Sequence, residues 1–86
     1  MSELREQIED LLFAIEFNLT CETYAQSERA KLEKITDEKE LSVLRTKLHK
    51  SANAFRLLHK KATTSQLELF KTAISPESLQ EELVKK

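Results

Sequence analysis

Residues 37–62, DEKELSVLRTKLHKSANAFRLLHKKA, carry the strongest structural signal in this chain. Small and apolar side chains recur there at alternating spacings of three and four, which is the repeat of a helix that buries one face. The members of this repeat are Leu41, Leu44, Leu48, Ser51, Phe55, Leu58 and Ala62. Asp37 precedes them as a candidate N-cap, with Glu40 three residues later. We therefore predict a helix over about 38–62 that pairs with an antiparallel neighbour in a coiled-coil-like seam.

The residues before this helix predict a first long helix. Ser2 can cap its start, and acidic residues follow in the first turns, where the helix dipole favours them. Apolar side chains recur at helical spacing at Leu4, Ile8, Leu11, Leu12, Ile15 and Leu19, and a rotated stripe continues through Ala25, Leu32 and Ile35. We predict one helix over about 3–34 and a short turn near 35–37, so that the two long helices form an antiparallel hairpin.

The region that follows the second helix permits two interpretations. The run Thr63-Thr64-Ser65 lowers helix propensity, and Ser65 with Glu68 offers a capping box for a separate segment. Leu69, however, still falls in phase with the apolar repeat. The second helix therefore either ends at this run or continues to about residue 74.

A short last helix is predicted over about 76–84. Ser75 can cap it, and Pro76 suits the first helical position, where its missing N–H costs no hydrogen bond. The 86 residues include no glycine and one proline, which disfavours folds that depend on tight β-turns. The predicted fold is all-α: two long antiparallel helices and a C-terminal helical segment in one small bundle over residues 1–86.

Composition also limits the chemistry and the setting of the protein. A chain without glycine has no glycine-rich phosphate loop and no dinucleotide-binding fingerprint. The single cysteine, Cys21, cannot form an internal disulfide, which favours a reducing compartment. The opening residues lack the pattern of a signal peptide, and no stretch is apolar for long enough to span a bilayer. We therefore expect a soluble, cytoplasmic protein that makes no membrane contact.

A second apolar stripe lies on the predicted 3–34 helix, on the side away from Ile8 and Ile15. Its members follow one another at spacings of four, four and three and so share a face: Phe13, Phe17, Cys21 and Tyr24. Contiguous exposed aromatic side chains need a cover. Either the C-terminal segment covers the stripe, through Leu67, Phe70, Ile74, Leu79 and Leu83, or another protein or a second copy of the chain does. These four residues are the predicted partner-binding site.

Charge is segregated along the chain although the net charge is only −1. Residues 1–35 carry eight acidic and four basic side chains, whereas residues 41–67 carry six basic and no acidic ones. One interpretation is that the two helices complement each other, with Glu16 near Arg56 and Glu22 near Lys50. The other is that a basic flank binds phosphate or an acidic protein surface; its members are Arg45, His49, Arg56 and Lys60.

Catalysis and metal binding are not expected. His49 and His59 lie ten residues apart and point to different parts of the helix surface, and a single cysteine cannot complete a zinc site. Cys21 is expected to be a small buried hydrophobe rather than a nucleophile. We predict no cofactor, no metal and no small-molecule substrate.

Three stretches are similar to the small helical-hairpin chaperones of bacterial type III secretion. They are the opening MSELREQ at residues 1–7, the charged turn Asp37-Glu38-Lys39, and the run SANAF at residues 51–55. None is a specific motif, so the similarity is one of architecture and does not establish function. The expected function is a non-catalytic protein–protein interaction module, such as an adaptor, a small chaperone or a regulatory subunit. The alternative is a nucleic-acid-binding regulator that uses the basic flank.

Overall fold

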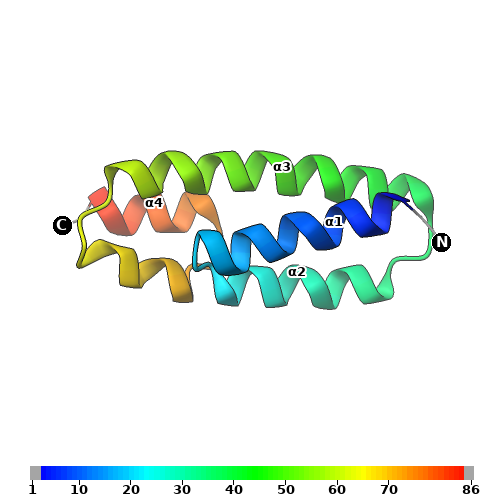
Figure 1. Ribbon diagram of the computed structural model, residues 1–86, viewed down its shortest axis with the longest axis horizontal. Helices are drawn as coiled ribbons and strands as arrows, with labels where there is room; N and C mark the ends of the chain where they lie inside the picture. The colour runs from blue at the N-terminus through cyan, green and yellow to red at the C-terminus, as the bar shows by residue number, and fades with distance from the viewer. Residues whose placement is uncertain (1–2, 85–86) are drawn as a thin grey trace.

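A computed structural model describes residues 3–84 and confirms the all-α small bundle (Figure 1). Its elements in chain order are α1 (Glu3–Phe13), the π-helical segment η1 (Ala14–Asn18), α2 (Glu22–Lys34), α3 (Glu38–Lys61), the 3₁₀ segment η2 (Gln66–Thr72) and α4 (Pro76–Val84). The predicted Ser2 cap lies outside the described residues.

The helix α3 is the long edge of the molecule, and two shorter helical pairs lie beside its two halves (Figure 1). α1 and α2 lie beside the first half, and η2 and α4 lie beside the second half. The bundle is therefore elongated, with extents of 43 × 19 × 18 Å. The two pairs share one core because α3 contributes buried side chains from Leu41 to Phe55.

The aromatic ring of Phe55 joins the two halves of this core. Tyr24 of α2 meets it edge to face, with ring centroids 5.2 Å apart, and Phe70 of η2 contacts it in a tilted arrangement at 6.4 Å. All three side chains are buried. Such aromatic contacts add about 0.5–1.5 kcal/mol each to the free energy that burial itself contributes. This cluster fixes α2 and the C-terminal segment on the same α3 helix.

The predicted single helix over 3–34 is wrong, because the chain reverses between Asn18 and Glu22. Thr20 adopts a φ of 57°, in the left-handed region that β-branched residues seldom occupy. The amide of Leu19 still donates to the Ala14 carbonyl at 3.2 Å, so η1 closes the helix with wider turns before the reversal. α2 then runs back along α1, and the hairpin of two long helices becomes a bundle with α1 and α2 as separate arms.

The reversal has a physical reason in the placement of the apolar residues. Each residue of a straight helix advances by about 100°. Ile8, Leu12 and Ile15 would therefore face one side of it, and Tyr24 and Leu32 would face nearly the opposite side. One helix could bury only one of these sets against α3, whereas the folded-back arrangement buries all five side chains. Burial of apolar surface stabilises the fold by roughly 25 cal/mol per Å². Burying the second set of side chains therefore outweighs the few kcal/mol that the strained backbone at the break costs.

The other helix boundaries follow local capping. Asp37 caps α3 by accepting from the Lys39 amide at 3.0 Å, and α3 ends at Lys61 rather than continuing to 74. η2 is capped by a box in which the Gln66 side chain accepts from the Thr63 amide at 2.9 Å and the Gln66 amide donates back to the Thr63 hydroxyl. The predicted box of Ser65 and Glu68 is not the one that forms, since Ser65 makes no side-chain cap bond.

The last helix begins at Pro76, where the sequence places it. The Ser78 amide donates to the Ser75 hydroxyl at 3.1 Å, so Ser75 is the cap. At the far end of the bundle, the guanidinium of Arg5 donates to the carbonyls of Leu32 and Ile35. A cation at a helix C-terminus complements the helix dipole, so Arg5 ties the end of α2 to the start of α1.

Candidate functional site

The four residues of the predicted aromatic stripe do not share a face. Phe13 and Phe17 are each 58% exposed, and their rings contact each other in a tilted arrangement with centroids 4.6 Å apart. Cys21 and Tyr24 are buried, with Tyr24 only 3% exposed. The expectation of one continuous stripe is therefore wrong, because the reversal at Thr20 turns α2 inward and leaves α1 with its aromatic side outward.

The C-terminal segment covers only the part of the stripe that α2 carries. η2 packs beside α2, and Phe70 and Leu79 are fully buried in the shared core. Ile74 was expected among the covering side chains but is 71% exposed. Phe13 lines a hollow between α1 and α2 together with Arg5, Glu9, Asp10, Arg29, Leu32 and Glu33. Phe17 contacts the ring of Phe13 and is not part of that lining.

Cys21 is a core residue. Its Sγ lies 3.5 Å from the Leu19 carbonyl oxygen, and burial raises the pKa of the thiol from 9.0 to about 12. A thiol attacks as the thiolate, so this side chain is chemically quiet near neutral pH.

The predicted basic flank lies along α3 but does not form a convergent site. Arg45 donates to Gln7 of α1 at 2.7 Å, and Arg56 donates to Asn53 one turn earlier at 3.1 Å. His49 and Lys60 are exposed. The expected pair of Glu16 with Arg56 is replaced by an ion pair of Glu16 with Arg29 of α2.

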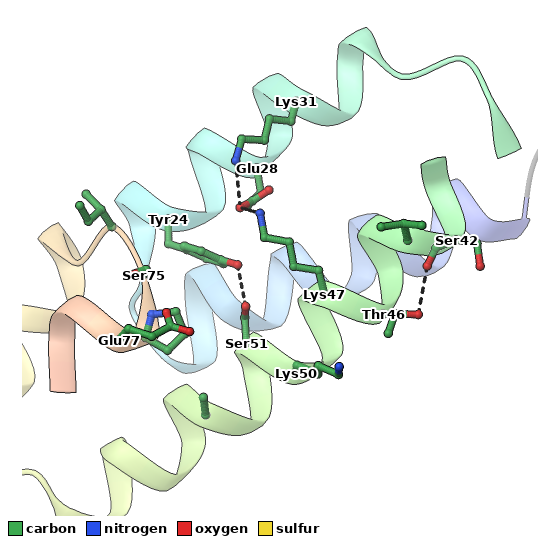
Figure 2. Close-up of a pocket in the computed structure, with 14 residues that line it drawn as sticks. Tyr24, Glu28, Lys31, Ser42, Thr46, Lys47, Lys50, Ser51, Ser75 and Glu77 are labelled. Atoms are coloured by element: carbon green, nitrogen blue, oxygen red, sulfur yellow. Dashed lines mark hydrogen bonds and ion pairs between the residues drawn. The ribbon is translucent and has the colours of Figure 1, made fainter. Parts of the chain in front are cut away.

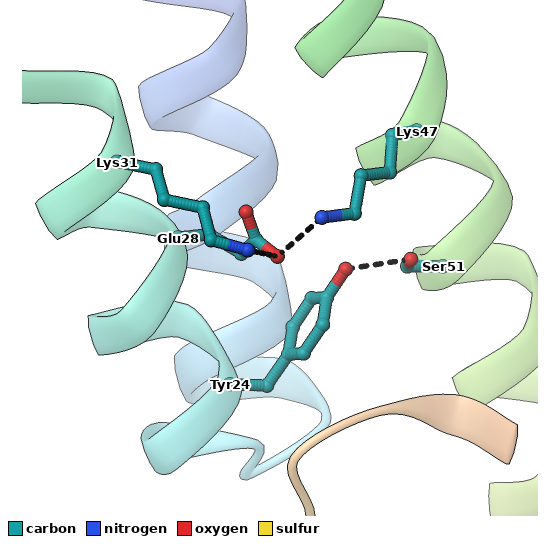
Figure 3. A network of polar contacts seen from close by, with 5 residues as sticks. All are labelled: Tyr24, Glu28, Lys31, Lys47 and Ser51. Atoms are coloured by element: carbon teal, nitrogen blue, oxygen red, sulfur yellow. Dashed lines mark hydrogen bonds and ion pairs between the residues drawn. The ribbon is translucent and has the colours of Figure 1, made fainter. Parts of the chain in front are cut away.

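A groove of about 900 Å³ runs between α2 and α3 (Figure 2). α2 lines it with Tyr24, Glu28 and Lys31, and α3 lines it from Ser42 to Ala54. The connection into α4 closes one end with residues 74–77. α1 lies behind the groove and carries α2 and α3 on its two sides (Figure 3). The two walls are bridged by side chains and not by close backbone packing.

A polar network forms the floor of this groove (Figure 3). The Tyr24 hydroxyl and the Ser51 hydroxyl share a hydrogen bond of 2.7 Å. Glu28 lies one turn after Tyr24 on α2, and its Oε1 accepts a hydrogen bond from the ammonium group of Lys47 on α3 at 2.9 Å. The ammonium group of Lys31 lies 3.6 Å from the same carboxylate oxygen. Two cations therefore share one oxygen of a single carboxylate.

Glu28 is the unusual member of the network. It is 2% exposed, and its second oxygen, Oε2, is buried with no hydrogen-bond partner among the described residues. A buried acceptor without a partner costs about 1–3 kcal/mol, and more when it is charged. Buried ion pairs are weak contributors to stability, since an apolar replacement is often neutral or favourable. A core chosen for stability alone would not place a carboxylate here.

The surroundings of the network shift the pKa values of two of its members, Tyr24 and Lys47. Burial is the main cause that raises the pKa of Tyr24 above 10.0, and its hydrogen bond to Ser51 acts in the opposite direction. The hydrogen bond to Glu28 is the main cause that raises the pKa of Lys47 above 10.5. Tyr24 therefore stays neutral and Lys47 stays charged across the physiological range.

A second hollow of about 370 Å³ extends the groove toward the α2–α3 turn. It shares Lys31, Val43 and Lys47 with the first and adds Ile35 and Lys39. The combined groove thus runs from the turn at one end of the bundle to the start of α4. Val43 is 70% exposed in its wall, and Ile74 stands at its far end.

The groove was not found from the sequence, although a signal existed. Tyr24, Glu28 and Leu32 follow one another at spacings of four, so Glu28 lies between two apolar residues on one helix face. Ser51 similarly interrupts the apolar repeat of α3. Two polar residues at core positions indicate polar contacts between the helices. In the structure, Ser51 bonds to Tyr24 and Glu28 pairs with Lys47.

Comparison with known protein families, curated proteins and solved structures finds no match for this chain. Within residues 3–84, no helix has the length and apolar character needed to cross a membrane. In the same range no three His, Cys, Asp or Glu side chains gather as a potential metal site. The groove and the exposed Phe13–Phe17 pair are therefore the surfaces from which a function must be argued.

Proposed function

We propose that this protein is a non-catalytic protein–protein interaction module that binds a helical segment of another chain in the groove between α2 and α3. The groove carries the proposal, because two large apolar side chains stand exposed along it. Val43 of α3 and Ile74 in the connection before α4 both line the groove and are 70% and 71% exposed. Exposed apolar side chains in a long groove are typical of helix-in-groove recognition.

The arrangement of helices favours a helical occupant. α1, α2 and α3 occupy three corners of a bundle, and the groove is the fourth. From Tyr24 to Ile35 the α2 wall is about 16 Å long, at 1.5 Å per residue, which corresponds to about three turns of a partner helix. A helix satisfies its own backbone hydrogen bonds, so it can enter such a groove at little cost in desolvated polar groups.

A designed peptide tests this function without knowledge of the natural partner. The probe is a stapled three-turn helix with leucines on one face and glutamines on its flanks. We expect it to shift the methyl resonances of Val43 and Ile74 in a two-dimensional NMR titration. Val43→Asp should abolish binding, whereas Leu57→Asp, at another exposed apolar position of α3 outside the groove, should leave it intact. Equal losses in the two variants, or shifts confined to other surfaces, would contradict the proposal.

The exposed Phe13–Phe17 pair is a second candidate contact, and we propose a second copy of the chain as its partner. Acidic Glu9 and Asp10 lie near Phe13 together with basic Arg29, so the surface carries both signs. A two-fold axis can place the acids of one copy against the base of the other. Light scattering over a dilution series tests this, since Phe17→Asp should abolish any self-association. Self-association that persists in Phe17→Asp would exclude this surface.

The nucleic-acid alternative has a distinct signature. Binding to phosphates weakens steeply as salt concentration rises, whereas apolar helix packing changes little. We expect no saturable binding of a fluorescent single-stranded oligonucleotide at physiological salt. Tight binding that is lost in the double variant Arg56→Gln, Lys60→Gln would favour the nucleic-acid alternative.

The proposed setting is the cytoplasm, in the role of an adaptor, small chaperone or regulatory subunit. The free cysteine, Cys21, supports this setting, since it is buried as a thiol. Reducing compartments preserve such a thiol.

A further inference from the structure

We infer that the groove selects an acidic amphipathic helix of another protein. This inference rests on the proposed function and adds the chemical character of the partner. The charges that line the combined groove carry it. Four lysines stand along the walls, Lys31, Lys39, Lys47 and Lys50, whereas the exposed acids there are Glu40 and Glu77.

The positive charge of the groove is only partly offset within the bundle: four lysines face the carboxylates of Glu28, Glu40 and Glu77, which leaves a formal charge of +1. Lys31 and Lys47 share one carboxylate, that of Glu28, so this cluster retains an excess positive charge. Lys39 and Lys50 take part in none of the ion pairs formed among residues 3–84. Lys31 and Lys47 remain about half exposed at their side chains, so their ammonium groups can still meet a second acceptor. An ammonium group has three donors, and Glu28 uses one of them.

The spacing of the lysines defines the pattern that a partner needs. Lys39 and Lys47 lie one turn before and one turn after Val43 on α3. An apolar side chain packed on Val43 would therefore be flanked by a cation on either side along the groove. Lys31 faces this position from the α2 wall. The complementary helix carries an apolar residue with acidic residues one turn away on both sides.

Glu28 adds a reason for the partner to be held at this place. Its Oε1 lies 2.9 Å from the ammonium nitrogen of Lys47 and 3.6 Å from that of Lys31, so one carboxylate holds both ammonium groups beside the groove. Acidic groups of a partner would compete for these same ammonium groups at the rim. The network thus holds the lysines beside the groove without fully consuming their charge.

Three stapled peptides of identical leucine face test the inference, with glutamate, glutamine or lysine on their flanks. We expect the glutamate peptide to bind about threefold to tenfold tighter than the glutamine peptide, because several exposed ion pairs at the rim each add modestly to affinity. The lysine peptide should bind more weakly than both. The advantage of glutamate should fall as salt rises, since the pairs are exposed. Dissociation constants from fluorescence anisotropy give all three values.

Charge reversal in the protein supplies the matched control. Lys39→Glu with Lys50→Glu should reverse the order of the glutamate and lysine peptides. Lys60→Glu, on the part of α3 that does not line the groove, should change each dissociation constant by less than about twofold. Circular dichroism should show all variants folded, because these lysines are exposed.

The outcomes separate the inference from the function on which it rests. Failure of all three peptides to perturb Val43 would overturn both. Equal binding of the three peptides, or tighter binding of the lysine peptide, would overturn the acidic partner and leave the groove as a helix-binding site. A solution mass of two chains that Val43→Asp returns to one would identify a second copy as the occupant and overturn a partner of another kind.

Discussion

Phe17 and Tyr24 are seven residues apart, two turns of an unbroken helix, yet their environments differ completely. Phe17 is 58% exposed, and its ring makes a tilted contact with Phe13. Tyr24 is 3% exposed, packs edge to face on Phe55 and shares a hydrogen bond with Ser51. One short reversal around Thr20 separates a surface aromatic residue from a core aromatic residue.

This difference shows what a helical repeat can and cannot predict. The spacing of Phe13, Phe17, Cys21 and Tyr24 defines a shared face only if the helix continues through all four. A break preserves the spacing within each part and changes the direction of one part relative to the other. The apolar residues that a pattern groups together can therefore divide between core and surface.

The largest test of the comparison is truncation of the two aromatic rings. Tyr24→Ala should lower the free energy of unfolding by about 3–5 kcal/mol, because it leaves a core cavity beside Phe55. Phe17→Ala should change it by less than about 0.5 kcal/mol, because the ring is mainly in solvent. Urea unfolding followed by circular dichroism measures both. Equal losses would mean that the two residues share one environment, as a continuous helix would require.

A milder variant keeps this test usable if Tyr24→Ala does not fold. Tyr24→Phe retains the ring and removes only the hydrogen bond to Ser51. The expected loss is about 1 kcal/mol. A Tyr24→Phe variant as stable as the parent would show that the hydroxyl pair contributes nothing to the core.

Much of the fold follows from local sequence signals. The Asp37 cap and the Ser75-Pro76 pair mark the starts of α3 and α4. Asp37 and Ser75 accept hydrogen bonds from backbone amides that would otherwise be unpaired, and Pro76 has no amide hydrogen to pair. The end of α3 was left open, and the Thr63–Gln66 box shows which signal decides it. That box satisfies amides at the start of η2 that a continuing helix would have paired internally.

The reversal at Thr20 was missed because no glycine or proline marks it. The rotated stripe through Ala25 and Leu32 was visible in the sequence, and it is the signal that a single helix cannot bury both faces on α3. The groove depends on this reversal, since it brings Glu28 opposite Lys47 and Tyr24 opposite Ser51. Contacts between residues so far apart in sequence follow from tertiary packing, which local patterns do not contain.

Cys21, three residues before Tyr24, also lies on the buried side of the reversal. Burial raises the pKa of Cys21 from 9.0 to about 12, so above pH 9.0 the unfolded chain releases a proton that the folded chain keeps. The contribution of the Cys21 thiol to the free energy of unfolding is therefore fully present below pH 9.0. It falls as pH rises toward 12, by up to about 1.4 kcal/mol per pH unit. The raised pKa values of Tyr24 and Lys47 act in the same direction at higher pH.

Unfolding by urea at neutral pH and at several alkaline values measures this slope. Cys21→Ala should make the decline shallower, although the variant is less stable at neutral pH because it loses a buried side chain. If the free energy of unfolding declined with pH equally in parent and variant, the Cys21 thiol would be exposed to solvent, as the ring of Phe17 is.

A substitution to glycine tests the reversal itself. Thr20→Gly should raise stability by about 1 kcal/mol, because glycine accepts the φ of 57° without the steric cost that threonine pays. Thr23→Gly is the matched control within α2, at an exposed position, and should lower stability by about 0.3 kcal/mol, because glycine is only slightly worse than threonine in a helix. Opposite signs in thermal unfolding would distinguish a turn at Thr20 from a helix at Thr23. A loss of stability in both would restore the continuous helix.

The smallest expected effect belongs to the ion pair that joins η1, which carries the exposed Phe17, to α2, which carries the buried Tyr24. Glu16 of η1, between Phe13 and Phe17 in sequence, pairs with Arg29 on α2, and Arg29 is about one third exposed at its side chain. Arg29→Gln should therefore lower stability by only about 0.2–1 kcal/mol, and a double-mutant cycle with Glu16→Gln isolates the coupling. The coupling should largely vanish at about 1 M salt, where the Debye length is about 3 Å. A coupling that survives such salt would mean that the pair is shielded from solvent. In that case a buried contact would hold η1 on α2, and Phe17 would depend on α2 more than its exposure indicates.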